Sequence, residues 1–319
     1  MTALSRLFQL VVTLLAASFL IFFAMQVLPG DPADVLLGQN ADPEAVAALR
    51  AELGLDRAIP IRFVDWLGGV LTGDLGVSAT YDVPVAHLIA ERAVVSLPLA
   101  ALAVGLAIVI ALPAGVGAAI ARGRPVDRVV VAGALVGLSV PNVWLGLILI
   151  FVFAVALGVA PAGGFPGWDQ GFGAFGALLM PAVALAAPQA AILTRLVRAA
   201  VLEALDEDYV TLARAKGRSR RAAVWRHALP NALPPILTLI GLQFGFLVAG
   251  GVIIETVFSL PGLGRLLFQA VAQRDLMVVQ GVVLVLVSMV VIVNAAMDGL
   301  ALLSDPRQRA DRPKAARAS

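Results

Sequence analysis

Cysteine is absent from the 319 residues, and only two histidines are present. The missing thiol excludes disulfides, thiolate metal sites, iron–sulfur clusters and a cysteine nucleophile. His87 and His227 are too few and too far apart to form a histidine metal site without carboxylates. An intramembrane hydrolase would need a base beside its nucleophile, and neither histidine falls inside an apolar segment. The sequence therefore predicts no catalytic, cofactor-binding or metal site.

Charge is also scarce, because only 14% of the residues are charged while 60% are hydrophobic. Soluble proteins average about 25% charged and about 45–50% apolar residues, so a soluble domain of this size could not bury so much apolar surface. The net charge of +2 does not indicate nucleic-acid binding, since the basic residues lie beside apolar segments. The composition predicts a protein embedded in a lipid membrane.

Long hydrophobic runs are plentiful. A membrane-spanning helix needs about 20 mostly apolar residues, because the hydrocarbon is about 30 Å thick. We therefore predict an all-α polytopic membrane protein of about six transmembrane helices, at residues 7–28, 94–121, 129–157, 177–197, 232–254 and 277–303. The first run is longer than the apolar core of a signal peptide, so we interpret it as a retained helix.

The basic residues predict the orientation. Seventeen of the 23 Lys and Arg fall at Arg6, in the turn 122–128, in the connection 195–226 and in the tail 307–317, which places both termini in the cytoplasm. The predicted divisions are residues 1–28 (cytoplasmic start and first span), 29–93 (extracytoplasmic subdomain), 94–303 (five-span transmembrane core, with a cytoplasmic connection at 201–231) and 304–319 (basic cytoplasmic tail).

The predicted external subdomain is acidic, with ten Asp and Glu against four Arg. Residues 42–54 predict a short amphipathic helix that begins at an Asp-Pro pair and ends at Gly54. The rest is rich in Gly, Pro and Asp, and we predict irregular structure there. Contact with a partner or substrate and a packing role are equally open for this segment.

The connection at residues 201–231 separates two spans by about thirty amphipathic, basic residues. Its apolar spacing predicts two short helices broken at Gly217, where a left-handed backbone costs little. One interpretation is an interfacial helix whose Lys and Arg hold anionic lipid headgroups.

This connection also resembles the cytoplasmic coupling loop of ABC-importer permeases, in which Glu-Ala-Ala is followed at fixed spacing by Gly and then by Leu-Pro. Gly217 matches the glycine, Ala213 the third position, and Leu229 and Pro230 the closing pair. Thr211, Leu212 and His227 depart from the general pattern. The run Tyr209 to Gly217 (YVTLARAKG) is similar to the dipeptide, oligopeptide and nickel branch of these permeases.

The branch resemblance continues along the chain, in runs at residues 28–32, 73–78, 255–258, 261–264, 274–275, 280–281 and 305–307. It implies a permease subunit that imports di- or oligopeptides or a related small solute by alternating access. The implied partners are a second homologous permease, two ATP-binding subunits that carry ATP and magnesium, and an extracytoplasmic substrate-binding protein. No phosphate-binding loop of the type G-x-x-x-x-G-K-[ST] occurs in the chain itself. The resemblance assigns the ATPase coupling to Tyr209, Thr211, Ala213, Arg214, Ala215, Lys216, Gly217, Leu229 and Pro230.

Polar residues in apolar segments are further candidates, since burial of polar groups in lipid is costly. Gln243 and Asn294 lie within predicted spans, and Glu255 lies at the outer end of one. We expect them to make contacts with an external protein or with the transport pathway, or to form hydrogen bonds between helices. An ion-coupled secondary transporter is the alternative function, although no carboxylate lies at the centre of a predicted span.

Overall fold

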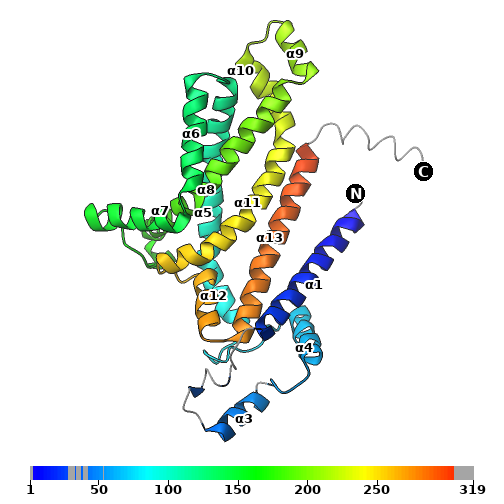
Figure 1. Cartoon of the computed structure of the whole chain (residues 1–319), viewed down its shortest axis with the longest axis vertical. Helices are drawn as coiled ribbons and strands as arrows, with labels where there is room; N and C mark the ends of the chain where they lie inside the picture. Colours follow the sequence, from blue (N-terminus) through cyan, green and yellow to red (C-terminus); the bar gives the residue numbers. More distant parts are fainter. Residues whose placement is uncertain (1–2, 28–32, 34–36, 39–41, 53, 305–319) are drawn as a thin grey trace, which may run out of the picture. The chain divides into compact units, whose positions relative to one another are not determined.

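The computed structural model describes residues 3–27, 33, 37–38, 42–52 and 54–304 (Figure 1). These residues form helices and loops without a strand, and one isolated antiparallel bridge joins Val77 to Pro84. The runs at residues 28–32 and 305–307, and the predicted tail beyond Ser304, lie outside the described residues. The elements are α1 (Ala3–Val27), α3 (Pro43–Glu52), α4 (Ile59–Thr72), α5 (Val85–Ile120), α6 (Pro125–Ser139), α7 (Asn142–Leu149), η1 (Ile150–Ala156), η2 (Trp168–Gln170), α8 (Phe172–Leu205), α9 (Asp208–Ala215), α10 (Arg220–Ala223), η3 (Val224–Ala228), α11 (Leu229–Val257), α12 (Leu263–Ala272) and α13 (Leu276–Ser304).

The prediction of an all-α membrane protein is confirmed. Among the described residues, α5, α8, the continuous helix Arg220–Val257 and α13 are each long and apolar enough to cross a membrane. The 25-residue helix α1 covers the first predicted span and includes the apolar helix Leu10–Ala24. Several helices exceed the predicted lengths. The 36 residues of α5 measure about 54 Å at about 1.5 Å per residue, well beyond the hydrocarbon thickness.

The third predicted span, residues 129–157, is not one continuous helix. It forms α6 and then α7 with η1, and the two parts meet at an angle of 93° (Figure 1). The bend occurs at Val140 and Pro141, which both have extended backbone angles. Proline disfavours the helical conformation of the residue before it and lacks an N–H of its own, so the helix ends at Ser139.

The chain divides into two compact units. The first contains Met1–Leu97 and Leu260–Val291, and the second contains Pro98–Ser259 and Ile292–Ser319. The predicted boundary between residues 93 and 94 lies four residues from the first division. The role of this boundary as a functional division stays a prediction. The sequence did not indicate that residues 260–291 join the first unit.

In the first unit, the predicted short helix at residues 42–54 is confirmed as α3. The prediction of irregular structure over the rest of the external subdomain was wrong for residues 59–72, which form α4. Phe63, Trp66 and Val70 lie at helical spacing on α4, and they pack with Phe22 and neighbouring apolar side chains of α1. The content of Gly, Pro and Asp in this segment favoured irregular structure, but Gly68 and Gly69 lie inside the helix.

A buried carboxylate connects two distant parts of the first unit. Asp275 is 1% exposed, and its Oδ1 accepts a hydrogen bond from the Val278 backbone at the start of α13. Its Oδ2 accepts hydrogen bonds from the Ser78 hydroxyl at 2.5 Å and from the Thr80 backbone at 3.2 Å. Asp275 therefore caps a spanning helix and holds the loop before α5 at the same time. Ser78 and Asp275 each belong to one of the sequence runs that carry the family resemblance.

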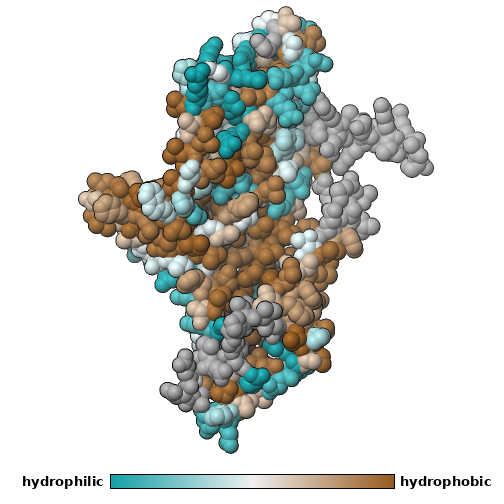
Figure 2. Space-filling model, in the orientation of Figure 1, coloured by the Kyte–Doolittle hydropathy of each residue, from teal (hydrophilic) through white to brown (hydrophobic). Residues whose placement is uncertain are grey.

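The second unit packs its helices closely through small residues. A Cβ atom on Gly115 of α5 would lie 2.7 Å from the Thr194 carbonyl oxygen and 2.8 Å from Val197 of α8. Buried apolar residues of α5, α8, η3 and α11, including Val197, Val201 and Ile236, form its core. Figure 2 shows hydrophobic side chains over α7 and the middle of the long helices, and hydrophilic ones over the end that carries α9 and α10.

Candidate functional site

The predicted break at Gly217 is confirmed. Helix α9 ends at Ala215, and Gly217 has a φ of +86° before α10 begins at Arg220. A Cβ atom at Gly217 would meet nothing within 4 Å, so a larger residue would be strained by the backbone angle and not by crowding. Ser219 caps α10 by accepting a hydrogen bond from the Ala222 backbone.

The second predicted short helix is not separate from the following span. It continues through the π-helical turn η3 into α11, which makes one helix from Arg220 to Val257. The closing pair Leu229 and Pro230 begins α11. Pro230 lacks an N–H, which favours an irregular turn just before it, and the Asn231 amide donates to the His227 carbonyl at 2.7 Å. A movement of α10 is therefore transmitted directly to α11.

One face of α9 is buried and the other is exposed. Val210 is fully buried against the core of the second unit, and Tyr209 packs beside it. Ala213 is half-buried, and the backbone of Arg214 lies in α9 while its side chain falls outside the described part. The candidate residues that face outward are Thr211, Ala215, Lys216 and Gly217.

Two large apolar side chains stand exposed on this segment. Leu212 is 56% exposed and Trp225 is 58% exposed. Neither was predicted as a site residue, because Leu212 counted only as a departure from the family pattern. Their exposure leaves two apolar side chains of the segment open to contact.

Charged side chains fix this segment and its neighbours. Arg220 donates a hydrogen bond from Nη2 to the Ala119 carbonyl oxygen at the end of α5, at 3.0 Å. Arg122, in the turn after α5, lies 3.6 Å from Asp206 at the end of α8. The candidate segment is thus tied to both helices of the second unit that end near it.

The strongest of these contacts joins α6 to α8. Arg198 makes a two-point ion pair with Asp127, with Nε to Oδ1 at 2.6 Å and Nη2 to Oδ2 at 2.8 Å. Asp127 is buried and also accepts a hydrogen bond from the Gly123 backbone at 2.9 Å. The signal available in the sequence was a single acid among the bases of the turn 122–128, with Arg198 directly after the fourth predicted span.

The three candidates within or near the spans do not form one site. Gln243 lines a cavity of about 20 Å³ among α5, α8 and α11, where its Nε2 finds no hydrogen-bond partner among the described residues. A Cβ atom on Gly241 would lie 2.7 Å from the Asn294 Oδ1, which indicates a close approach of α11 and α13 within the second unit. Glu255 is buried within α11. Their contacts with cargo or an external protein stay predictions.

Known proteins resemble this chain over nearly its whole length. Residues 111–310 match the family described as binding-protein-dependent transport system inner membrane component, and residues 2–97 match the N-terminal part of such membrane components. A putative peptide transport system permease protein of Brucella abortus (strain 2308) is 42% identical over 98% of this chain and 100% of its own length. A glutathione transport system permease protein of Salmonella choleraesuis is 37% identical over 96% and 98%.

The fold also resembles a solved structure. An inward-facing MetNI methionine ABC transporter superposes with a TM-score of 0.56 and 22% identity, over 68% of this chain and 96% of that one. These similarities do not favour an ion-coupled secondary transporter. The chain belongs to the family of binding-protein-dependent transport system inner membrane components, and it is the multi-pass permease subunit of an ABC importer in the bacterial inner membrane.

Proposed function

We propose that this permease subunit imports di- or oligopeptides or a related small solute. The similar proteins named for peptide transport in Brucella and for glutathione transport in Salmonella support this cargo class. The proposed partners are a second homologous permease, two ATP-binding subunits and an extracytoplasmic substrate-binding protein. ATP and magnesium belong to the ATP-binding subunits, since this chain has no phosphate-binding loop of its own.

The segment 201–231 is the proposed contact with the ATP-binding subunits. The observation that carries this role is the shape of α9, which is anchored on one face by Val210 and exposes Leu212 on the other, with the exposed Lys216 directly after it. Because the segment is continuous with α8 and α11 apart from short breaks, a push on α9 tilts both spans. Alternating access then follows as a rigid-body change driven by the ATP-binding subunits.

Replacing Gly217 with Val should uncouple ATP hydrolysis from uptake. A β-branched residue is strained at a φ of +86°, so α9 would be reoriented relative to α10 while the spans still insert. We expect uptake by reconstituted vesicles to fall at least about tenfold, with loss of the ATPase stimulation by loaded binding protein. Both rates are measured on the same vesicles.

Gly158→Val is the matched control. Gly158 also has a positive φ, of +65°, and open space around it, but it follows η1 and lies outside the coupling segment. It should cost similar backbone strain and leave the stimulation of ATP hydrolysis intact. Normal coupling in Gly217→Val would contradict the docking role and favour the interfacial-helix interpretation.

The proposed orientation places α9 in the cytoplasm and the loop before α5 outside. The absence of native cysteine allows a direct measurement, since each introduced thiol is the only one in the chain. Ala79→Cys should react with a membrane-impermeant maleimide in spheroplasts, whereas Lys216→Cys should react only after permeabilisation; both positions are exposed. The opposite labelling pattern would overturn the orientation.

A further inference from the structure

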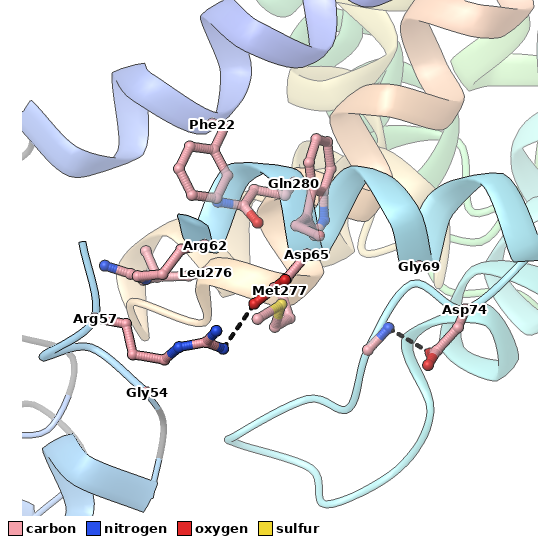
Figure 3. A pocket seen from close by; sticks show the side chains of 12 residues that line it. Phe22, Gly54, Arg57, Arg62, Asp65, Gly69, Asp74, Leu276, Met277 and Gln280 are labelled. Carbon is pink, nitrogen blue, oxygen red and sulfur yellow. Dashed lines mark hydrogen bonds and ion pairs between the residues drawn. The ribbon is translucent and has the colours of Figure 1, made fainter. Parts of the chain in front are cut away.

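The first unit contains an open cleft of about 240 Å³ that the coupling segment does not explain (Figure 3). Its walls are formed by α4, the start of α13, the end of α1 and the loops on either side of α4. The polar side chains that line it are Arg57, Arg62, Asp65, Trp66, Asp74 and Gln280. None of them was predicted from the sequence as a site residue.

Gln280 is the first sign that this cleft is built for a ligand. The residue is 2% exposed, and Figure 3 shows its side-chain amide directed into the cleft. Buried side-chain amides are nearly always hydrogen-bonded in folded proteins, so an amide held at a cleft wall is positioned to pair with a molecule in the cleft.

Trp66 is the second sign. It lies on α4, is 7% exposed, and its indole Nε1 has no hydrogen-bond partner among the described residues. The ring packs against Phe22 and Phe63, with centroids 5.9 and 6.3 Å away, so its position is fixed by apolar contacts. A buried, unpartnered indole N–H and a buried side-chain amide thus line one cleft from different helices.

The cleft is lined by two basic and two acidic side chains, so their formal charges balance. Arg57 and Arg62 lie at one end in Figure 3, and Asp74 lies at the other. Asp65 forms an ion pair with Arg57 at 2.7 Å, in which both side chains are more than half exposed. An ion pair so exposed to solvent is weak, and it can exchange partners at little cost.

These features define the chemistry of the missing ligand. A glutamine amide offers a donor and an acceptor, which matches both groups of a peptide bond, and an indole N–H matches a carbonyl oxygen. Opposite charges at the two ends match a zwitterion. The volume lies below the 300–1,000 Å³ of clefts for drug-sized ligands, so the occupant is small.

We propose that this cleft binds a short zwitterionic peptide of about dipeptide size. Its carboxylate lies toward Arg57 and Arg62, its amino group lies toward Asp74, and its peptide group pairs with Gln280. The assignment of a peptide rests on the proposed function. In the proposed orientation the cleft lies on the outer side of the membrane and gives the permease a cargo site of its own, apart from the binding protein.

Calorimetric titration of the assembled permease–ATPase complex in lipid nanodiscs, without binding protein, tests this site. We expect dialanine to bind saturably, and N-acetyl-dialanine amide, which lacks both charges, to bind at least about tenfold more weakly. Gln280→Met should weaken dialanine binding about tenfold or more. Because methionine has a shape similar to that of glutamine, this variant should fold as well as the wild type.

Gln243→Met is the matched control, because Gln243 is a glutamine with an unpaired buried amide nitrogen that lies in the second unit. It should bind dialanine like the wild type. Trp66→Phe keeps an aromatic ring, although a smaller one, and removes the N–H, and it should weaken binding several-fold. Circular dichroism melting of each variant separates loss of binding from loss of folding.

The proposal is overturned if the wild type shows no saturable dialanine binding, or if Gln280→Met binds like the wild type. Equal binding of the uncharged analogue would overturn the zwitterion assignment. Uptake of radiolabelled dialanine by the complete importer separates the two proposals. Uptake without binding to the cleft would overturn this site and leave the proposed function standing, whereas binding without uptake would contradict the proposed cargo and support the site.

Discussion

Arg198→Met should lower the stability of the permease by about 3–5 kcal/mol. The substitution leaves Asp127 as a buried carboxylate that has lost both hydrogen bonds from the guanidinium and keeps one from the Gly123 backbone. Removing one partner of a buried ion pair typically costs about this much, because the remaining charge is desolvated and uncompensated. Thermal unfolding of the purified subunit in detergent, followed by circular dichroism, measures the effect.

The double variant Asp127→Leu with Arg198→Met should recover most of the lost stability. Apolar replacements of similar volume remove the desolvation cost together with the attraction, and such exchanges are often neutral or stabilising. Arg195→Met is the matched control, since Arg195 lies one turn earlier on α8 and is exposed. A melting temperature of Arg198→Met equal to that of Arg195→Met would show that the ion pair contributes little.

Asp275→Ala should loosen the loop before α5 and fray the start of α13. The carboxylate accepts three hydrogen bonds, from Ser78, Thr80 and Val278, and it is almost fully buried. Hydrogen bonds to charged groups contribute about 1.5–3 kcal/mol each, and water that enters the cavity restores part of them, so we expect a loss of about 2–4 kcal/mol. Hydrogen exchange should accelerate at the amides of Thr80 and Val278.

Asp275→Asn separates the two roles of this residue. One amide oxygen can still cap α13 at Val278, but the second acceptor is replaced by a donor that cannot receive the Thr80 amide. We therefore expect protection to be retained at Val278 and lost at Thr80. Asp56→Ala is the control, because Asp56 is an exposed acid of the same unit. Unchanged exchange at both amides in Asp275→Ala would contradict the clamp.

The bend in the third span shows which local sequence signals predict a break in a helix. Apolar composition alone predicted one helix through residues 129–157. The Val140-Pro141 pair was the available sign of a break, because proline acts on its own N–H and on the residue before it. In helix α4 the opposite error occurred. The content of Gly, Pro and Asp favoured irregular structure, whereas the apolar face of Phe63, Trp66 and Val70 keeps the helix intact.

The coupling segment, residues 201–231, was predictable in part because some of its structure also depends on local sequence signals. Its break depends on the backbone freedom of Gly217, and its helices depend on apolar spacing within a few residues. The continuation of α10 into α11 and the exposure of Leu212 and Trp225 were not predictable. Exposure is set by which face of a helix the rest of the unit covers, and that depends on residues far away in the chain.

The sequence by itself determined that the chain is embedded in a membrane and that it is helical. It also determined that Gly217 interrupts the connection between two spans. These properties follow from hydrophobic length and from backbone preferences that act over a few residues. The tertiary structure alone decided that Asp127 meets Arg198, that Asp275 holds Ser78, and that Trp66 and Gln280 face one cleft. Such pairs are separated by tens to hundreds of residues, and only the packing of the helices brings them within hydrogen-bonding distance of each other or of one ligand.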